Sequence, residues 1–129
     1  MYQKISMEMR ERIVKSFLDM AIMAKLMVGD PTSGYDFITF FHRKFGVLLS
    51  PGTVYSVIYS MERQGLVNGV PNDRKRVYQL TEKGEETMKS ALSMIAEIQF
   101  FIEVLLGGKH AELNRNEEFQ LKVDAKNRR

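Results

Sequence analysis

A short β-hairpin pattern set among helical patterns restricts the fold of this chain more than any other feature. Residues 66–70 and 74–80 are rich in β-branched and aromatic side chains, and Pro71-Asn72-Asp73 between them is typical of a turn. Three segments with helical spacing of apolar residues precede the hairpin, and a longer one follows it. This order predicts a mostly α-helical α+β fold with one small hairpin.

The first helical segment is expected to form one amphipathic helix over residues 7–28. Gly29 and Pro31 should end it, because Gly favours the left-handed position after a helix and Pro cannot continue one. The residues predicted to form its apolar face, which recur at spacings of three and four, are Ile13, Phe17, Met20, Ala24 and Met27.

Two shorter helices follow, each with a serine cap. Ser33 begins a capping box that Asp36 completes, and Gly46 closes that helix. Ser50 begins the next helix, with Pro51 at its first position and Gln64-Gly65 at its end. The predicted buried face of this third helix is Val54, Val57, Ile58 and Met61. Its outer face and flanks are Gly52, Thr53, Tyr55, Ser56, Tyr59, Ser60 and Arg63.

The last helical segment, about residues 82–106, is capped by Thr81 and has two apolar seams. One seam can cover the core of its own domain, and the second favours a partner, for which another copy of the chain is the simplest choice. We therefore expect a homodimer. The residues predicted for the dimer interface are Met88, Leu92, Ile95, Ile98, Phe101, Ile102 and Leu105.

These patterns divide the chain into residues 7–80 as a first domain, 81–106 as a dimerisation helix and 107–129 as a polar tail. The chain has no cysteine, which excludes disulfides and thiolate chemistry, and His42 and His110 lack the spacing of metal ligands. It also has no phosphate-binding glycine loop or nucleophile elbow. We expect no enzymatic activity, no cofactor and no metal. No apolar run suits a membrane span or a signal peptide, so a cytoplasmic protein without membrane contact is expected.

Cations concentrate around the hairpin, although the net charge of the chain is only +3. Three helices followed by a hairpin with a basic tip is the order of a winged helix-turn-helix, whose third helix enters the major groove of DNA. Small polar side chains let that helix approach bases and phosphates, and cations neutralise the backbone. The residues predicted to contact double-stranded DNA are Ser50, Gly52, Thr53, Tyr55, Ser56, Tyr59, Arg63, Arg74, Lys75 and Arg76.

Three segments of the chain also resemble a known family. They are Ser33-Gly34-Tyr35-Asp36, Ser50-Pro51-Gly52-Thr53-Val54-Tyr55 and Tyr78-Gln79-Leu80-Thr81-Glu82-Lys83-Gly84, and the similarity covers about residues 12–106. The chain is similar to PadR-like transcription regulators. The resemblance implies a homodimer joined through C-terminal helices, which binds a pseudo-palindromic operator and usually represses transcription. It also places DNA contacts at Ser50, Gly52, Thr53, Tyr55 and the hairpin cations.

The resemblance leaves the effector open. An unknown small-molecule effector stays open as a partner, but the chain has no Trp and so lacks the aromatic slot that some relatives use for flat ligands, which argues against such sensing. Two other functions stay as alternatives: a chromatin-like protein that coats DNA without sequence preference, and a winged helix that binds another protein. The small polar outer face of the third helix and the cationic hairpin favour DNA over a protein partner.

Overall fold

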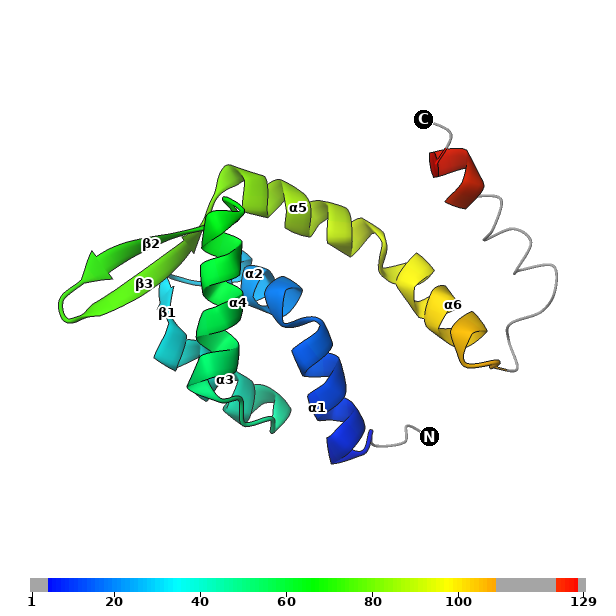
Figure 1. Cartoon of the computed structure of the whole chain (residues 1–129), viewed down its shortest axis with the longest axis horizontal. Coiled ribbons are helices and arrows are strands. Elements are labelled where there is room, and N and C mark those ends of the chain that lie inside the picture. The colour runs from blue at the N-terminus through cyan, green and yellow to red at the C-terminus, as the bar shows by residue number, and fades with distance from the viewer. Residues whose placement is uncertain (1–4, 109–122, 128–129) are drawn as a thin grey trace. The chain divides into compact units, whose positions relative to one another are not determined.

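The computed structural model, shown in Figure 1, describes residues 5–108 and 123–127. These residues form two compact units that divide after Lys89. Most of the predicted polar tail, residues 109–122 and 128–129, lies outside the described residues. The helices are α1 (Met7–Ser16), α2 (Leu18–Val28), α3 (Gly34–Phe45), α4 (Pro51–Arg63), α5 (Glu82–Ser93) and α6 (Ile95–Leu105), and the strands are β1 (Thr32–Ser33), β2 (Val67–Asn72) and β3 (Lys75–Leu80).

The predicted hairpin is confirmed, and it belongs to a small antiparallel sheet in the order β1-β3-β2. Its turn differs from the prediction: Pro71 and Asn72 continue β2, and the turn is Asp73-Arg74, with Asp73 at a φ of 58°. Pro71 is tolerated in a strand because β2 lies at the edge of the sheet. Strand β1 was not predicted, since two residues are too short to show an alternating pattern.

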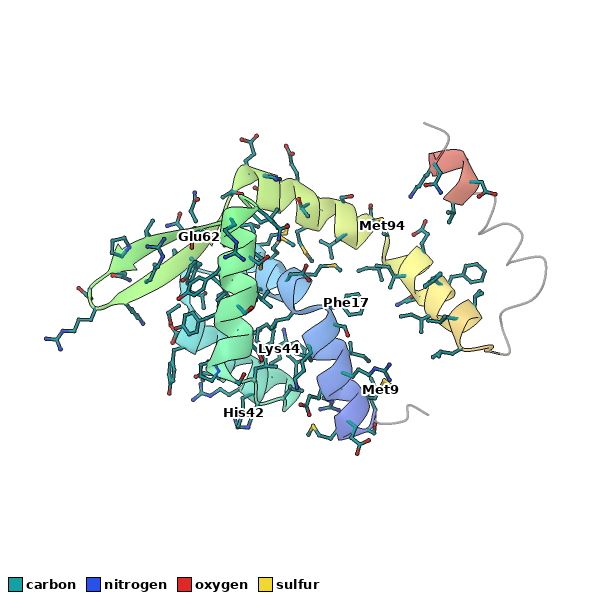
Figure 2. The ribbon with its side chains drawn as sticks, viewed as in Figure 1. Met9, Phe17, His42, Lys44, Glu62 and Met94 are labelled. Carbon is teal, nitrogen blue, oxygen red and sulfur yellow. The ribbon has the colours of Figure 1, made fainter. Side chains whose placement is uncertain are left out.

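The prediction of one helix over residues 7–28 is wrong, because the helix breaks at Phe17, whose φ is −111° and ψ is 22° (Figure 2). Next to the break, the Asp19 carboxylate accepts the backbone N–H of Met20 at 2.8 Å, a local bond that competes with helical pairing. The predicted apolar face is also wrong. The residues that α2 buries are Leu18, Ile22, Met23 and Leu26.

The predicted caps of the central helices are confirmed with one exception. Ser33 Oγ accepts the N–H of Asp36 at 3.1 Å, and Gly46 ends α3 in the left-handed conformation with a φ of 70°. Gly29, in contrast, follows α2 in extended backbone with a φ of −130°, so the left-handed position expected there is wrong. Because Pro31 comes two residues later, the chain leaves α2 directly toward β1 instead of closing a C-terminal cap.

The core of the first unit lies where α2, α3 and α4 pack together, with α2 and α3 against β3 and α4 against β2. The Phe37 and Phe41 rings of α3 are fully buried with centroids 6.4 Å apart, and Tyr78 of β3 is 1% exposed. The α4 residues Val54, Ile58 and Met61 face this core as predicted. Together these elements form a winged helix, in which the hairpin of β2 and β3 is the wing (Figure 1).

Helix α5 begins at a junction that fixes the base of the wing. Thr81 Oγ1 accepts the N–H of Gly84 at 3.0 Å, which confirms the predicted cap, and donates to the Gly65 carbonyl at 2.6 Å. Lys83 Nζ donates to the Gln64 carbonyl at 2.7 Å. A β-carbon on Gly84 would collide with the carbonyl oxygen of Leu66. The junction therefore requires glycine at this position.

The prediction of one helix over residues 82–106 is also wrong, because Met94 separates α5 from α6 with a φ of −102° and a ψ of 4° (Figure 2). No proline or glycine causes this break. Ser93 Oγ donates to the carbonyl of Ser90 at 2.7 Å, and serine bonds of this kind bend helices.

Candidate nucleic-acid interface

The N-terminus of α4 is open to solvent and carries a serine cap. Ser50 Oγ accepts the backbone N–H of Thr53 at 3.2 Å and donates to Thr53 Oγ1 at 2.9 Å. Pro51 occupies the first turn, where its missing N–H breaks no helical bond. The remaining N–H groups of this turn and the positive end of the helix dipole can receive a phosphate.

The outer face of α4 presents small and polar groups. Gly52 and Ser56 are exposed, Tyr59 is 48% exposed, and a β-carbon on Gly52 would meet no atom within 4 Å. Arg63 is exposed at the other end of the same helix. This surface has room for close approach of a groove, and the structure brings these predicted residues together on one helix face.

The Tyr55 ring packs against residues of both α3 and α4. Its ring packs directly over Gly34 at the start of α3, where any β-carbon would overlap the ring. Its centroid is 5.8 Å from that of Tyr59. A glycine at residue 34 therefore allows α3 and α4 to approach and sets the position of Tyr55.

Arg76 of the wing forms an ion pair with a carboxylate of α4. Its guanidinium donates to Glu62 Oε2 of α4 at 2.6 Å and lies 6.0 Å from the Tyr78 ring. The same carboxylate oxygen accepts the N–H of Gly69 at 3.2 Å. Arg76 holds the pKa of Glu62 below its ordinary value, and burial raises the pKa of Tyr78. Figure 2 shows Glu62 where α4 passes the base of the wing.

The other two wing cations differ from each other. Lys75 Nζ lies 3.4 Å from the Asp36 carboxylate of α3, in a pair with both side chains at least half exposed. The Ser33 hydroxyl, more than Lys75, lowers the pKa of Asp36. Arg74 stands at the turn and has no ion pair with any residue that the structure describes. Of the three, Arg74 is the cation most available to a phosphate.

Sequence reasoning missed Glu62 and Gly34, which position the predicted residues. Glu62 lies 14 residues before Arg76, and Gly34 lies 21 residues before Tyr55. No pattern within either helix links such distant positions. The residues predicted for the dimer interface differ in their exposure. Met88 is only 6% exposed. Those more than 40% exposed are Leu92, Ile95, Phe101, Ile102 and Leu105.

The described residues contain no cluster of three metal-ligating side chains. Within the same part of the chain, no helix is both long and apolar enough to cross a membrane.

The fold and this surface together define a winged helix protein with an exposed face on α4 and a cationic wing. Comparison with known proteins then identifies the family. The model of the transcriptional regulator PadR-like family matches residues 23–90, which is more than half of the 129 residues. The protein belongs to the PadR-like family of transcriptional regulators, as the sequence motifs implied. It is therefore a DNA-binding regulator of transcription.

Solved structures show the same fold at low sequence identity. A PadR-like transcriptional regulator from Bacillus cereus is 19% identical with a TM-score of 0.63, covering 76% of this chain and 99% of the other. A PadR family regulator from Clostridium difficile is 20% identical with a TM-score of 0.60, covering 70% and 98%. A transcriptional regulator from Clostridium thermocellum is 18% identical with a TM-score of 0.65, covering 78% and 96%. No curated protein matches the chain.

Proposed function

We propose that this protein is a homodimeric repressor that binds a pseudo-palindromic DNA site through α4 and the wing. In this proposal residues 7–80 bind DNA, residues 81–106 join two copies, and residues 107–129 form a polar tail, in a cytoplasmic protein. One observation carries the proposal: the small, polar outer face of α4 starts at an open helix N-terminus and lies beside a cationic hairpin.

Helix α4 is the element that reads the groove. The exposed Ser56 and Tyr59 can reach base edges or phosphates, and Gly52 lets the backbone come close. Arg63 supplies the one guanidinium of this face, a group that pairs with guanine through two hydrogen bonds. Ser50 and Thr53 orient the first turn, whose N–H groups face a phosphate.

The wing contributes charge to the neighbouring DNA backbone. Arg74 has no acidic partner in the described structure and meets a phosphate first. Lys75 is held by a long, exposed pair with Asp36, which a phosphate can replace at small cost because exposed pairs are worth about 0.2–1 kcal/mol. Arg76 mainly fixes the wing to α4, since its bond to Glu62 is short.

Two copies of the chain are required for a two-fold site. The exposed apolar side chains of α6 are a surface that a second copy can cover, and a long exposed apolar face is unfavourable for a monomer. In the dimer the two α4 helices would lie about 34–36 Å apart, which is one turn of DNA.

The decisive experiment is fluorescence anisotropy with a duplex from the region upstream of the protein's own gene and a scrambled duplex, over a range of salt concentrations. We expect tight binding to the native fragment, a steep salt dependence and a clear preference over the scrambled DNA. Equal binding to both would support a protein that coats DNA without sequence preference. Absence of binding at low salt would support a protein-interaction module.

The wing and the sign of regulation have tests of their own. Arg74→Gln should weaken binding to both duplexes and reduce the salt slope by about 0.9 for each copy, or about 1.8 for the dimer, while Lys89→Gln, which removes the same charge from α5, should not. If the salt slope of Arg74→Gln equals that of the wild type, the wing does not contact the DNA backbone through Arg74. Repression predicts that a promoter reporter with the native fragment rises when the protein is absent.

A further inference from the structure

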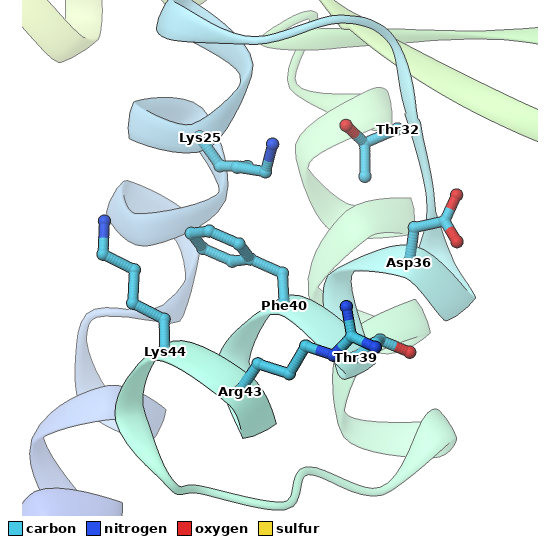
Figure 3. A pocket seen from close by; sticks show the side chains of 7 residues that line it. All are labelled: Lys25, Thr32, Asp36, Thr39, Phe40, Arg43 and Lys44. Carbon is cyan, nitrogen blue, oxygen red and sulfur yellow. The ribbon is translucent and has the colours of Figure 1, made fainter.

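A pocket between α2 and α3 lies outside the DNA surface proposed above, and we call it the α2–α3 pocket. Its volume is about 470 Å³, and it is lined by Lys25 of α2, Thr32 of β1, and Asp36, Thr39, Phe40, Arg43 and Lys44 of α3 (Figure 3). All of these residues belong to the first compact unit. Neither α4 nor the wing contributes a lining residue.

The pocket gathers positive charge that no carboxylate of the described residues neutralises in an ion pair. Lys25, Arg43 and Lys44 form no ion pair with a carboxylate in the described part of the chain. The side chains of Lys25 and Arg43 enter from different helices, on either side of the Phe40 ring (Figure 3). Three cations that share one pocket repel each other, so an anion placed between them would lower their energy.

Phe40 holds two of these cations near the pocket without cancelling their charge. Lys25 Nζ lies 5.0 Å and Lys44 Nζ 5.4 Å from the centroid of the ring. Cation–π contacts of this length orient an ammonium group but leave its full charge available. The ring therefore replaces the acidic partners that surface lysines commonly have, such as Glu11 for Lys15.

The single acid of the pocket is already engaged. The backbone N–H of Asp36 donates to the Ser33 hydroxyl in the cap of α3, and its carboxylate pairs with Lys75 of the wing at 3.4 Å. It offers little neutralisation to Lys25 or Arg43. The Thr39 hydroxyl makes only a long bond of 3.4 Å to the carbonyl of Tyr35, so it can turn toward a ligand at small cost.

We propose that the α2–α3 pocket binds a phosphate group. Arg43 can hold two phosphate oxygens through its planar fork, and Lys25 and Lys44 supply point charges for a doubly charged anion. The open mouth between the two helices suits a phosphate carried by a larger molecule. That molecule is either DNA that flanks the bound site or a small phosphorylated compound, and the chemistry of recognition is the same for both.

Inorganic phosphate, titrated into the full-length protein without DNA, tests the site directly. In ¹H–¹⁵N spectra we expect saturable shifts at the backbone amides of Thr39, Phe40 and Arg43 that sodium chloride at equal ionic strength does not produce. The double variant Lys25→Gln/Arg43→Gln should lose them. The control Lys15→Gln/Lys89→Gln removes the same charge from two lysines paired elsewhere and should keep them.

Shifts that do not saturate, that chloride reproduces, or that persist in Lys25→Gln/Arg43→Gln would overturn the proposal. All four substituted residues are exposed or at the surface, and thermal melts of both double variants check that they fold. Should Lys25→Gln/Arg43→Gln melt early, the single change Lys44→Gln should still weaken phosphate binding several-fold. Unchanged binding in that variant would also count against the site.

Anisotropy with DNA separates the two sources of phosphate. If flanking DNA fills the pocket, Lys25→Gln/Arg43→Gln should reduce the salt slope by about 0.9 for each copy, or about 1.8 for the dimer, relative to the control, and bound DNA should suppress the phosphate shifts. If a small molecule fills it, the slope should equal that of the control and the shifts should persist in the DNA complex. Both results support a phosphate site. The phosphate titration needs no operator, so it stands even if the proposed repressor function fails.

Discussion

A β-carbon on Gly84 would collide with the backbone oxygen of Leu66, whereas one on Gly52 would meet open space. Both glycines lie in the first turns of helices, where alanine is intrinsically favoured by up to about 1 kcal/mol. The same substitution should therefore have opposite consequences. Gly84 lets α5 pack against the backbone at the base of the wing, and Gly52 leaves room for DNA to approach α4.

Gly84→Ala should lower the free energy of unfolding by about 1–3 kcal/mol, because the backbone of Leu66 cannot move aside as a side chain could. Gly52→Ala should leave that free energy equal or slightly higher while weakening DNA binding. Urea denaturation and anisotropy measure the two effects. Equal stability of the two variants would contradict the steric role of Gly84.

The bond between Glu62 and Arg76 gives the wing a dependence on pH. The Glu62 carboxylate has a pKa below the ordinary value of 4.5 in the folded protein. The bond therefore stabilises the fold fully at pH values above 4.5, and this stabilisation is lost as the pH falls through the lower pKa of the folded state. In thermal melts the melting temperature of the wild type should be higher than that of Glu62→Gln at neutral pH. This difference in melting temperature should disappear below about pH 4. A gap that is the same at every pH would mean that the charge of Glu62 contributes nothing.

At the scale of the element, the wing depends on a two-residue turn with an unusual backbone. Asp73 takes a φ of 58° without being glycine. Aspartate tolerates this left-handed conformation better than β-branched residues do. The turn sets the register in which Asn72 faces Lys75, and so it sets where the wing cations project.

Asp73→Val should destabilise the protein by about 1–2 kcal/mol, and Asp73→Gly should be neutral or stabilising, because only glycine takes this φ without steric cost. Both variants remove the same charge, so the difference between their free energies of unfolding in chemical denaturation measures the effect of the backbone conformation alone. If the valine variant is as stable as the glycine variant, residue 73 does not take the left-handed conformation and the turn lies at other residues.

At the scale of the whole molecule, the proposed homodimer depends on the exposed apolar residues of α6. Ile102→Glu should yield monomers in sedimentation, because two glutamates would meet without neutralisation at the interface. Ala96→Glu adds the same charge at an exposed small residue of the same helix and should leave the dimer intact. A dimer that survives Ile102→Glu would place the interface on another surface.

Much of the fold follows from neighbouring residues. The caps at Ser33, Ser50 and Thr81 were predicted because each depends on bonds to residues three positions away. The hairpin and the two faces of α4 were predicted because their patterns repeat within a few residues. The helix breaks at Phe17 and Met94 were not, because neither coincides with a proline or glycine.

The sequence by itself determined the class of fold, the family and the residues of the candidate DNA surface, since these reside in local patterns and motifs. Only the tertiary structure decided which cations are free. Glu62 meets Arg76 and Asp36 meets Lys75 across 14 and 39 residues, and Lys25 of α2 lies over the Phe40 ring of α3. The physical reason is that side-chain pairing depends on distances in space, which packing of the whole core sets and no local pattern records.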